Sequence, residues 1–219
     1  MKQVTSGIVL LAMAFVMASC GNGIKGDKVE SGEAQAEQII KGEKTLKADL
    51  TASNIAWTGS KPTGKHNGTI MLKEGNLELS EGNLVGGSFT IDISSIKVLD
   101  LTDAKMNGDL RGHLLSADFF HVDSFPTSTF VITGVEALNE AGATHRITGN
   151  LTMKGISRSI SFPASVKIEE QKLTATSSAF VINRAEWNIR YGSRSFFKNL
   201  KDNFINDEIG LKINLTATL

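Results

Sequence analysis

Residues 159–169 read SISFPASVKIE, and an apolar side chain occupies every second position of this stretch. Polar or charged residues fill most of the positions between. A period of two is typical of a β-strand that turns one face to water and the other to an apolar core. The stretch therefore predicts a strand in the wall of a β structure. Its apolar face is formed by Ile160, Phe162, Ala164, Val166 and Ile168.

The same alternation recurs along the chain, for example in residues 89–93, 146–154 and 208–219. Turn signals rich in Gly, Asn and Glu separate these segments. Many antiparallel strands with a single apolar face close as a sandwich or a barrel. We count about eight strands, near residues 51–60, 67–73, 76–80, 83–96, 128–138, 144–154, 157–169 and 172–183, with a closing strand near 205–218.

One segment breaks the period. Residues 103–116 (DAKMNGDLRGHLLS) lack β-branched side chains and predict a helix, for which Asp103 or Thr102 is available as N-cap. Met106, Leu110, His113 and Leu114 share one stripe of this helix. A long strand, a short helix and further strands predict an all-β antiparallel barrel with the helix near its mouth.

The N-terminus has the pattern of an export signal. Lys2 precedes the apolar run 7–17, and Met-Ala-Ser-Cys occupies positions 17–20. This resembles a bacterial lipobox, so we expect residues 1–19 to be a signal peptide and Cys20 to carry the lipid anchor. Several acyl chains hold a protein on a membrane stably. No acidic residue follows Cys20 before Asp27, which favours the periplasmic face of the cell envelope.

Residues 20–48 are rich in Gly, Glu and Lys, and we expect a flexible stalk that is transiently helical near 33–41. Residues 21–26 match G-x-G-x-x-G, but neither a strand before them nor a helix after them supports a dinucleotide site. Residues 49–219 are the predicted barrel domain. The chain is formally neutral, with 23 basic and 23 acidic residues, which argues against a nucleic-acid partner.

Several motifs resemble the YceI-like family. Residues 110–126 (LRGHLLSADFFHVDSFP) are similar to its HL-x-S-x-DFF run, 149–156 (GNLTMKGI) to its G-x-L-T hairpin, and 180–189 (FVINRAEWNI) to its later F-x-I-x-R segment. Trp57 with Gly59, Gly64, His66 and Gly68 fits a subset that begins with tryptophan. Together the motifs span about residues 50–219.

The resemblance implies a lipocalin-like barrel whose elongated apolar cavity holds an isoprenoid chain with a polar head. It thereby implies binding of a polyisoprenoid or quinone-like lipid, without catalysis and without a further cofactor. The family often has an acidic residue two positions before the histidine of HL, where this chain has Arg111. Asp109 lies on the same helical face as His113 and would substitute.

Two candidate site residues carry alternatives. His113 either makes a hydrogen bond from the helix to the barrel, through Asp109 or a backbone carbonyl, or touches a ligand head group at the mouth. Arg184 either forms a structural ion pair, with Asp118 or Asp109 favoured as its partner, or binds the head group. The aromatic residues either form the core or line the cavity. The full candidate set is Trp57, His66, Phe89, His113, Phe119, Phe120, Phe130, Arg184 and Trp187.

Other chemistry finds little support in the sequence. The four histidines, His66, His113, His121 and His145, show no metal-ligand spacing, and no catalytic motif is present. A second hypothesis is an envelope interaction or stress-response module whose barrel is filled by its own side chains. A third is an enzyme that acts on an isoprenoid. The oligomeric state is left open, and a dimer is compatible with the sequence.

Overall fold

The computed structural model describes residues 24–37, 40–140 and 142–219. The predicted signal peptide and Cys20 therefore lie outside the described residues. The elements are β1 (Asp27–Lys28), β2 (Gly32–Glu33), β3 (Lys44–Ala48), β4 (Asn54–Lys61), β5 (Gly64–Ser80), β6 (Asn83–Val98), α1 (Ala104–Leu115), β7 (Thr127–Glu140), β8 (Ala143–Met153), β9 (Ile156–Glu169), β10 (Lys172–Ser177), β11 (Phe180–Asn183), the 3-10 helices η1 (Arg184–Trp187) and η2 (Lys201–Asn203), and β12 (Glu208–Thr218).

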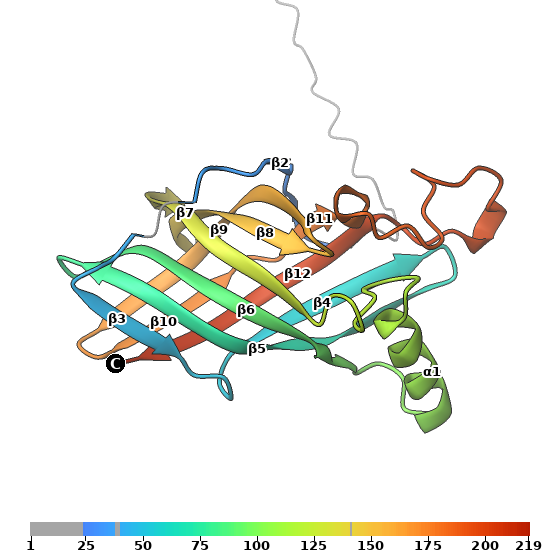
Figure 1. Cartoon of the computed structure of the whole chain (residues 1–219), viewed down its shortest axis with the longest axis horizontal. Coiled ribbons are helices and arrows are strands. Elements are labelled where there is room, and N and C mark those ends of the chain that lie inside the picture. The colour runs from blue at the N-terminus through green and yellow to red at the C-terminus, as the bar shows by residue number, and fades with distance from the viewer. Residues whose placement is uncertain (1–23, 38–39, 141) are drawn as a thin grey trace, which may run out of the picture.

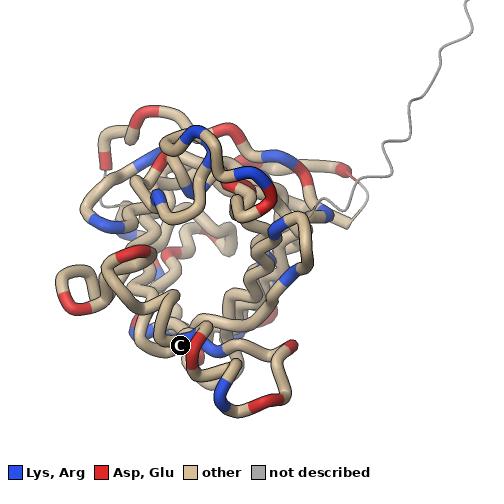
Figure 2. The backbone as a smooth tube through the Cα atoms, turned by 90° about the vertical axis from the view of Figure 1, so that its right-hand side faces the viewer, with Lys and Arg blue, Asp and Glu red and all other residues tan. Residues whose placement is uncertain are grey.

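Eight strands close into an antiparallel ring, which Figure 2 shows along the long axis of the molecule from the end that carries α1. Neighbours pair in chain order from β4 to β10. The last strand, β12, then joins β10 to β4, with Leu173 opposite Ala217 and Leu211 opposite Trp57. The predicted all-β barrel is confirmed. Closure leaves the ring without free edges.

The alternating apolar side chains, apart from the exposed Leu219, face inward and join one hydrophobic cluster. One predicted turn is wrong, because β5 runs unbroken through Glu74, Gly75 and Asn76 with a shift of register between Leu72 and Glu74. A Cβ atom at Gly75 would lie 2.5 Å from the Phe89 ring. The glycine therefore makes room for an aromatic ring on the opposite strand instead of turning the chain.

Helix α1 lies at one end of the barrel, at the right of Figure 1, and follows β6 directly. The side chain of Asp103 accepts a hydrogen bond from the backbone N–H of Met106, which confirms the predicted N-cap. Leu110 and Leu114 of the helix pack against the hydrophobic cluster, whereas Met106 is exposed. The helix therefore covers part of the barrel opening with one apolar stripe.

The segment expected to be a flexible stalk is partly built into the sheet, which corrects that prediction. β1 pairs with β11, β2 pairs with β9, and β3 pairs with β5 and β12. Glu33, expected near a helix, lies in β2. The composition was misleading because a strand that completes an existing sheet needs few apolar residues of its own. Leu46 of β3 is fully buried at the barrel end opposite α1.

Candidate functional site

The barrel encloses a cavity of about 630 Å³. This volume lies within the range of roughly 300–1,000 Å³ that is usual for small-molecule sites. Its wall is built from the inward faces of the ring strands and is mainly aliphatic and aromatic. Far from the helix it is bounded by buried leucines from four strands, namely Leu77, Leu84, Leu173 and Leu215.

The cavity opens at the end that carries α1. Every exposed residue of its lining belongs either to the β4–β5 turn or to the loop between η1 and β12. These two segments are tied together, since the backbone N–H of Asn206 donates to the carbonyl of Ser60 at 2.9 Å and their side chains bond at 2.8 Å. The mouth is thus formed by α1, the β4–β5 turn and the loop 188–205. Its exposed lining residues are Lys61, Thr63, Gly64, Tyr191, Asp202 and Asn203.

The structure brings eight of the nine candidate residues to this wall. They are Trp57, His66, Phe89, His113, Phe119, Phe120, Phe130 and Arg184. Trp187 is the exception, because it is completely buried outside the cavity, where its indole N–H donates to the carbonyl of Leu151 at 2.9 Å. Trp187 is therefore a structural residue that attaches η1 to β8. Contact of the other eight with a ligand stays a prediction.

Two of the cavity phenylalanines owe their positions to glycines. A Cβ atom on Gly149 would lie 2.5 Å from the Phe130 ring, and a Cβ atom on Gly75 would lie 2.5 Å from the Phe89 ring. Phe130 also contacts Phe162, whose ring stacks on Phe180 with centroids 4.6 Å apart. These rings pack against the wall instead of filling the centre, and so leave the cavity open.

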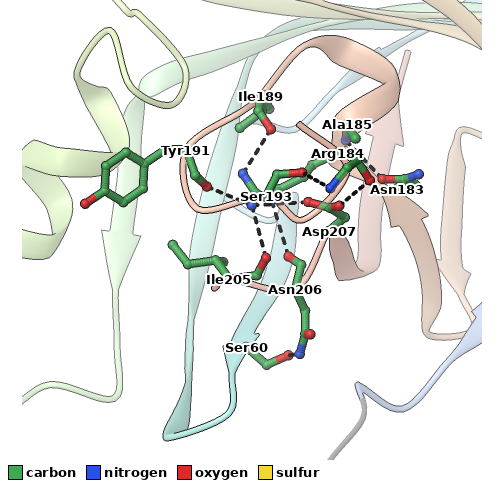
Figure 3. A network of polar contacts seen from close by, with 11 residues as sticks. Ser60, Asn183, Arg184, Ala185, Ile189, Tyr191, Ser193, Ile205, Asn206 and Asp207 are labelled. Atoms are coloured by element: carbon green, nitrogen blue, oxygen red, sulfur yellow. Dashed lines mark hydrogen bonds and ion pairs between the residues drawn. The ribbon is translucent and has the colours of Figure 1, made fainter. Parts of the chain in front are cut away.

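Arg184 is the centre of a polar network at the mouth, shown in Figure 3. Its side chain is 2% exposed. The guanidinium donates to four backbone carbonyls of the following loop, those of Ile189 (3.0 Å), Tyr191 (2.8 Å), Ile205 (3.2 Å) and Asn206 (3.2 Å). A planar fork of donors suits such a convergence of carbonyls. Arg184 thereby fixes the path of the loop that forms one side of the mouth.

The ion-pair partner of Arg184 is Asp207, whose Oδ1 lies 3.3 Å from Nη2. The prediction of Asp118 or Asp109 is wrong, because Asp118 contacts His113 and Asp109 pairs with Lys105. Burial lowers the pKa of Arg184, and the charge of Asp207 opposes that shift. Asp207, which directly precedes β12, therefore provides the counter-charge for the buried Arg184.

His113 faces the aromatic side of the mouth. Its Nε2 lies 3.2 Å from Oδ2 of Asp118, which corrects the predicted bond to Asp109 or a backbone carbonyl. Its ring meets the rings of Phe119 and Tyr191 edge-on, with centroids 5.1 and 4.4 Å apart. Tyr191 was not among the predicted residues, since an isolated tyrosine in a polar loop carries no periodic signal.

On the other side of the mouth, Nδ1 of His66 lies 2.8 Å from Oδ2 of Asp100. Burial of Asp100 acts to raise its pKa, but hydrogen bonds from the Asn67 N–H and from His66 outweigh it, so the pKa is lowered. The carboxylate thus holds β5 against the segment that leads into α1.

Trp57 lines the cavity and carries a polar indole N–H. Its side chain is buried, and within the described ranges its indole Nε1 has no hydrogen-bond partner. A buried donor without a partner costs free energy unless something else satisfies it. Because Nε1 itself is closed to the cavity as well as to solvent, this cost belongs to the packing around β4, and Trp57 lines the wall with its ring and not with its N–H.

Comparison with known proteins fits this architecture. A model of the YceI-like domain matches residues 46–217. The chain belongs to the YceI-like family. The match begins at residue 46, inside β3 and two residues before the end of the predicted stalk at residue 48. This agrees with the place of β3 in the barrel.

Curated relatives include two UPF0312 proteins of Pseudomonas putida, from strains GB-1 and W619. They are 34% and 33% identical to this YceI-like protein over 88 residues, which is 39% of this chain and 44% of each relative. The match thus spans less than half of the length of these relatives.

Solved structures share the fold. BcnA of Burkholderia cenocepacia superposes with a TM-score of 0.61 at 23% identity, over 78% of this chain and 99% of that chain. A polyisoprenoid-binding domain from Saccharophagus degradans superposes with a TM-score of 0.57 at 15% identity, over 79% and 97% of the two chains. The YceI-like barrel is therefore common to all three proteins.

Proposed function

We propose that this YceI-like protein binds an apolar, isoprenoid-type lipid, a polyisoprenoid or a quinone-like molecule, inside its barrel. The observation that carries the proposal is the cavity of about 630 Å³ with an apolar wall and a mouth at one end. The structural neighbour from Saccharophagus degradans is itself described as polyisoprenoid-binding. The protein acts as a carrier or reservoir and not as an enzyme.

The energetics are sufficient without a charged anchor. A tail that loses about 400 Å² of apolar surface gains roughly 10 kcal/mol at 25 cal/mol/Å². Immobilising the tail and the ligand offsets several of these kcal/mol. What remains, about 5–7 kcal/mol, corresponds to a Kd of roughly 10–200 μM. An apolar cavity of this kind attracts water poorly, so water competes little with a hydrocarbon.

The polar features of the wall favour a ligand with an oxygen-bearing head. The half-buried histidines His66 and His113 at the mouth would bond to such an oxygen. Arg184 is already committed to four carbonyls and to Asp207, which supports its structural alternative. The head group would therefore lie at the mouth, beside His66 and His113.

The proposal includes the envelope location. Residues 17–20 have the lipobox pattern, so Cys20 would carry the acyl chains that anchor the protein, facing the periplasm. No helix in the described part of the chain is long and apolar enough to span a bilayer. Metabolic labelling of the wild-type chain with a fatty-acid analogue would test this. Label must appear in the wild type and be lost in Cys20→Ser, and equal labelling of both would refute the anchor.

The alternative of an interaction module rests on a barrel filled by its own side chains. The cavity contradicts that premise. The lipid proposal is tested on a chain that begins at residue 21, which keeps every strand of the closed ring. Purified without detergent from bacterial cells and extracted with organic solvent, it should release an isoprenoid-type lipid in about equimolar amount. Protein that repeatedly yields no lipid would refute the proposal.

A further inference from the structure

The exposed apolar side chains gather at one end of the barrel. Of seven large apolar residues that are exposed within the described ranges, five lie at the mouth end, on α1, on the segment leading into it and on the loop 188–205. The other two, Leu50 and Leu219, lie near the opposite end. The five at the mouth end are Leu99, Met106, Tyr191, Phe196 and Phe197. The mouth end therefore exposes more apolar side chains than the rest of the described surface does.

The loop 188–205 combines these aromatic residues with cations. It contains four basic residues, Arg190, Arg194, Lys198 and Lys201, and a single acidic residue, Asp202. The whole chain, in contrast, is formally neutral. The nearby carboxylate of Asp207 is occupied by Arg184 and by the hydroxyl of Ser195. The loop thus presents a net positive surface, to which Lys61 adds from the β4–β5 turn.

The loop holds its aromatic residues at the surface through its own contacts. The guanidinium of Arg190 lies 4.6 Å from the centroid of the Phe196 ring, and that of Arg194 lies 3.4 Å from the Phe204 ring. Phe196 and Phe197 remain 37% and 47% exposed. Exposed aromatic rings interleaved with cations are the side chains that settle at the interface of an anionic bilayer.

The position of the N-terminus gives an independent reason. Ile24, the first described residue, contacts Gly210, near the mouth end of β12. Ile24 is four positions after Cys20, and four fully extended residue steps span roughly 14 Å at most. If Cys20 carries the anchor, as proposed above, the mouth half of the barrel lies next to the membrane surface.

We propose that the mouth end docks on the surface of an anionic phospholipid bilayer through the loop 188–205, with the exposed Leu99 and Met106 beside it. Phe196 and Phe197 enter the interface, and the four cations contact phosphate-bearing head groups. The docked mouth faces the bilayer, so that an apolar ligand passes between membrane and cavity without crossing water. The docking surface goes beyond lipid binding and rests on the proposed function only for this last step.

The test uses the chain that begins at residue 21, which carries no anchor, with sedimentation of vesicles of phosphatidylethanolamine and phosphatidylglycerol. Binding should exceed that to pure phosphatidylcholine vesicles and should fall at an ionic strength of 1 M, where the Debye length is about 3 Å. Lys198→Ala should weaken binding about fivefold, as expected for one cation at an anionic surface. The matched control Lys172→Ala, at the opposite end, should bind as the wild type does.

A second pair of variants measures how deeply the loop 188–205 enters the bilayer. Phe197→Trp should be quenched by brominated lipid, whereas Leu219→Trp at the opposite end should show no quenching beyond the wild-type background. No binding to anionic vesicles, equal loss with the Lys172 control, or equal quenching at both positions would overturn the proposal. Phe197 and Lys198 do not line the cavity, so their variants should keep the co-purified lipid. Lipid content therefore reports on the cavity, and sedimentation reports on the docking surface.

Discussion

Replacing Arg184 with methionine would separate its structural role from a role in ligand binding. Methionine has a similar length but cannot donate hydrogen bonds. The substitution would leave the carboxylate of Asp207 without its buried counter-charge and would leave four backbone carbonyls of the loop without their donor. The structure therefore predicts a loss of stability centred on the mouth.

The expected magnitude follows from burial. Removing one partner of a buried ion pair costs about 3–5 kcal/mol, because the other charge stays buried and unpaired. The side chain is 2% exposed, so water cannot replace the lost contacts in the native structure. Against a typical unfolding free energy of 5–15 kcal/mol, this loss is large. Arg184→Lys should recover only part of it, because an ammonium cannot reproduce the planar fork.

Urea unfolding followed by circular dichroism measures the effect. The matched control is Arg146→Met, which removes a 38% exposed arginine 3.7 Å from Glu140 and should cost at most about 1 kcal/mol. The reasoning would be refuted if Arg184→Met unfolded with the same free energy as Arg146→Met. If Arg184→Met kept the stability of Arg146→Met but lost its co-purified lipid, Arg184 would be a head-group contact instead.

Three further predictions concern the cavity and its mouth. Ala164→Trp places a large ring on the cavity wall, so lipid content should fall while the urea midpoint stays near that of the wild type, and an unchanged lipid content would show that the ligand lies elsewhere. Trp57→Phe removes an indole N–H that faces neither solvent nor the cavity, so an oxygen-bearing isoprenoid and the matching hydrocarbon should lose the same affinity in a calorimetric titration, and a loss confined to the oxygen-bearing ligand would contradict this. Because the folded-state pKa of Asp100 is lowered below 3.8, its contribution to stability is present above that value and is lost as the pH falls through the folded-state pKa. Urea midpoints measured across this acid range should fall less steeply for Asp100→Asn, and identical pH profiles would contradict this.

The regular part of the fold was predictable from the sequence because each wall strand carries its own period of two. The stretch 159–169 became β9, and the segment 103–116 became α1 with Asp103 as its cap. Strand β3 escaped prediction because Leu46 is its one large apolar residue among polar and charged neighbours. Its place is set by pairing with β5 and β12, which a local pattern cannot reveal.

The same distinction holds at the candidate site. Inward-facing residues such as Phe89 and Phe130 could be predicted, since alternation fixes the face on which they lie. The partner of Arg184 could not, because Asp207 is 23 positions later and reaches the guanidinium only through the path of an irregular loop. Trp187 was misplaced for a related reason: η1 interrupts the strand period and turns its indole toward β8.

A crystal structure of the protein as purified from cells, without added ligand, tests the central claim most directly. Electron density that extends continuously along the barrel axis from the mouth, in contact with the Phe89 and Phe130 rings, is the result predicted here. A cavity that contains separate water molecules, or that is closed by inward movement of its own side chains, would contradict the claim that the barrel holds an apolar lipid.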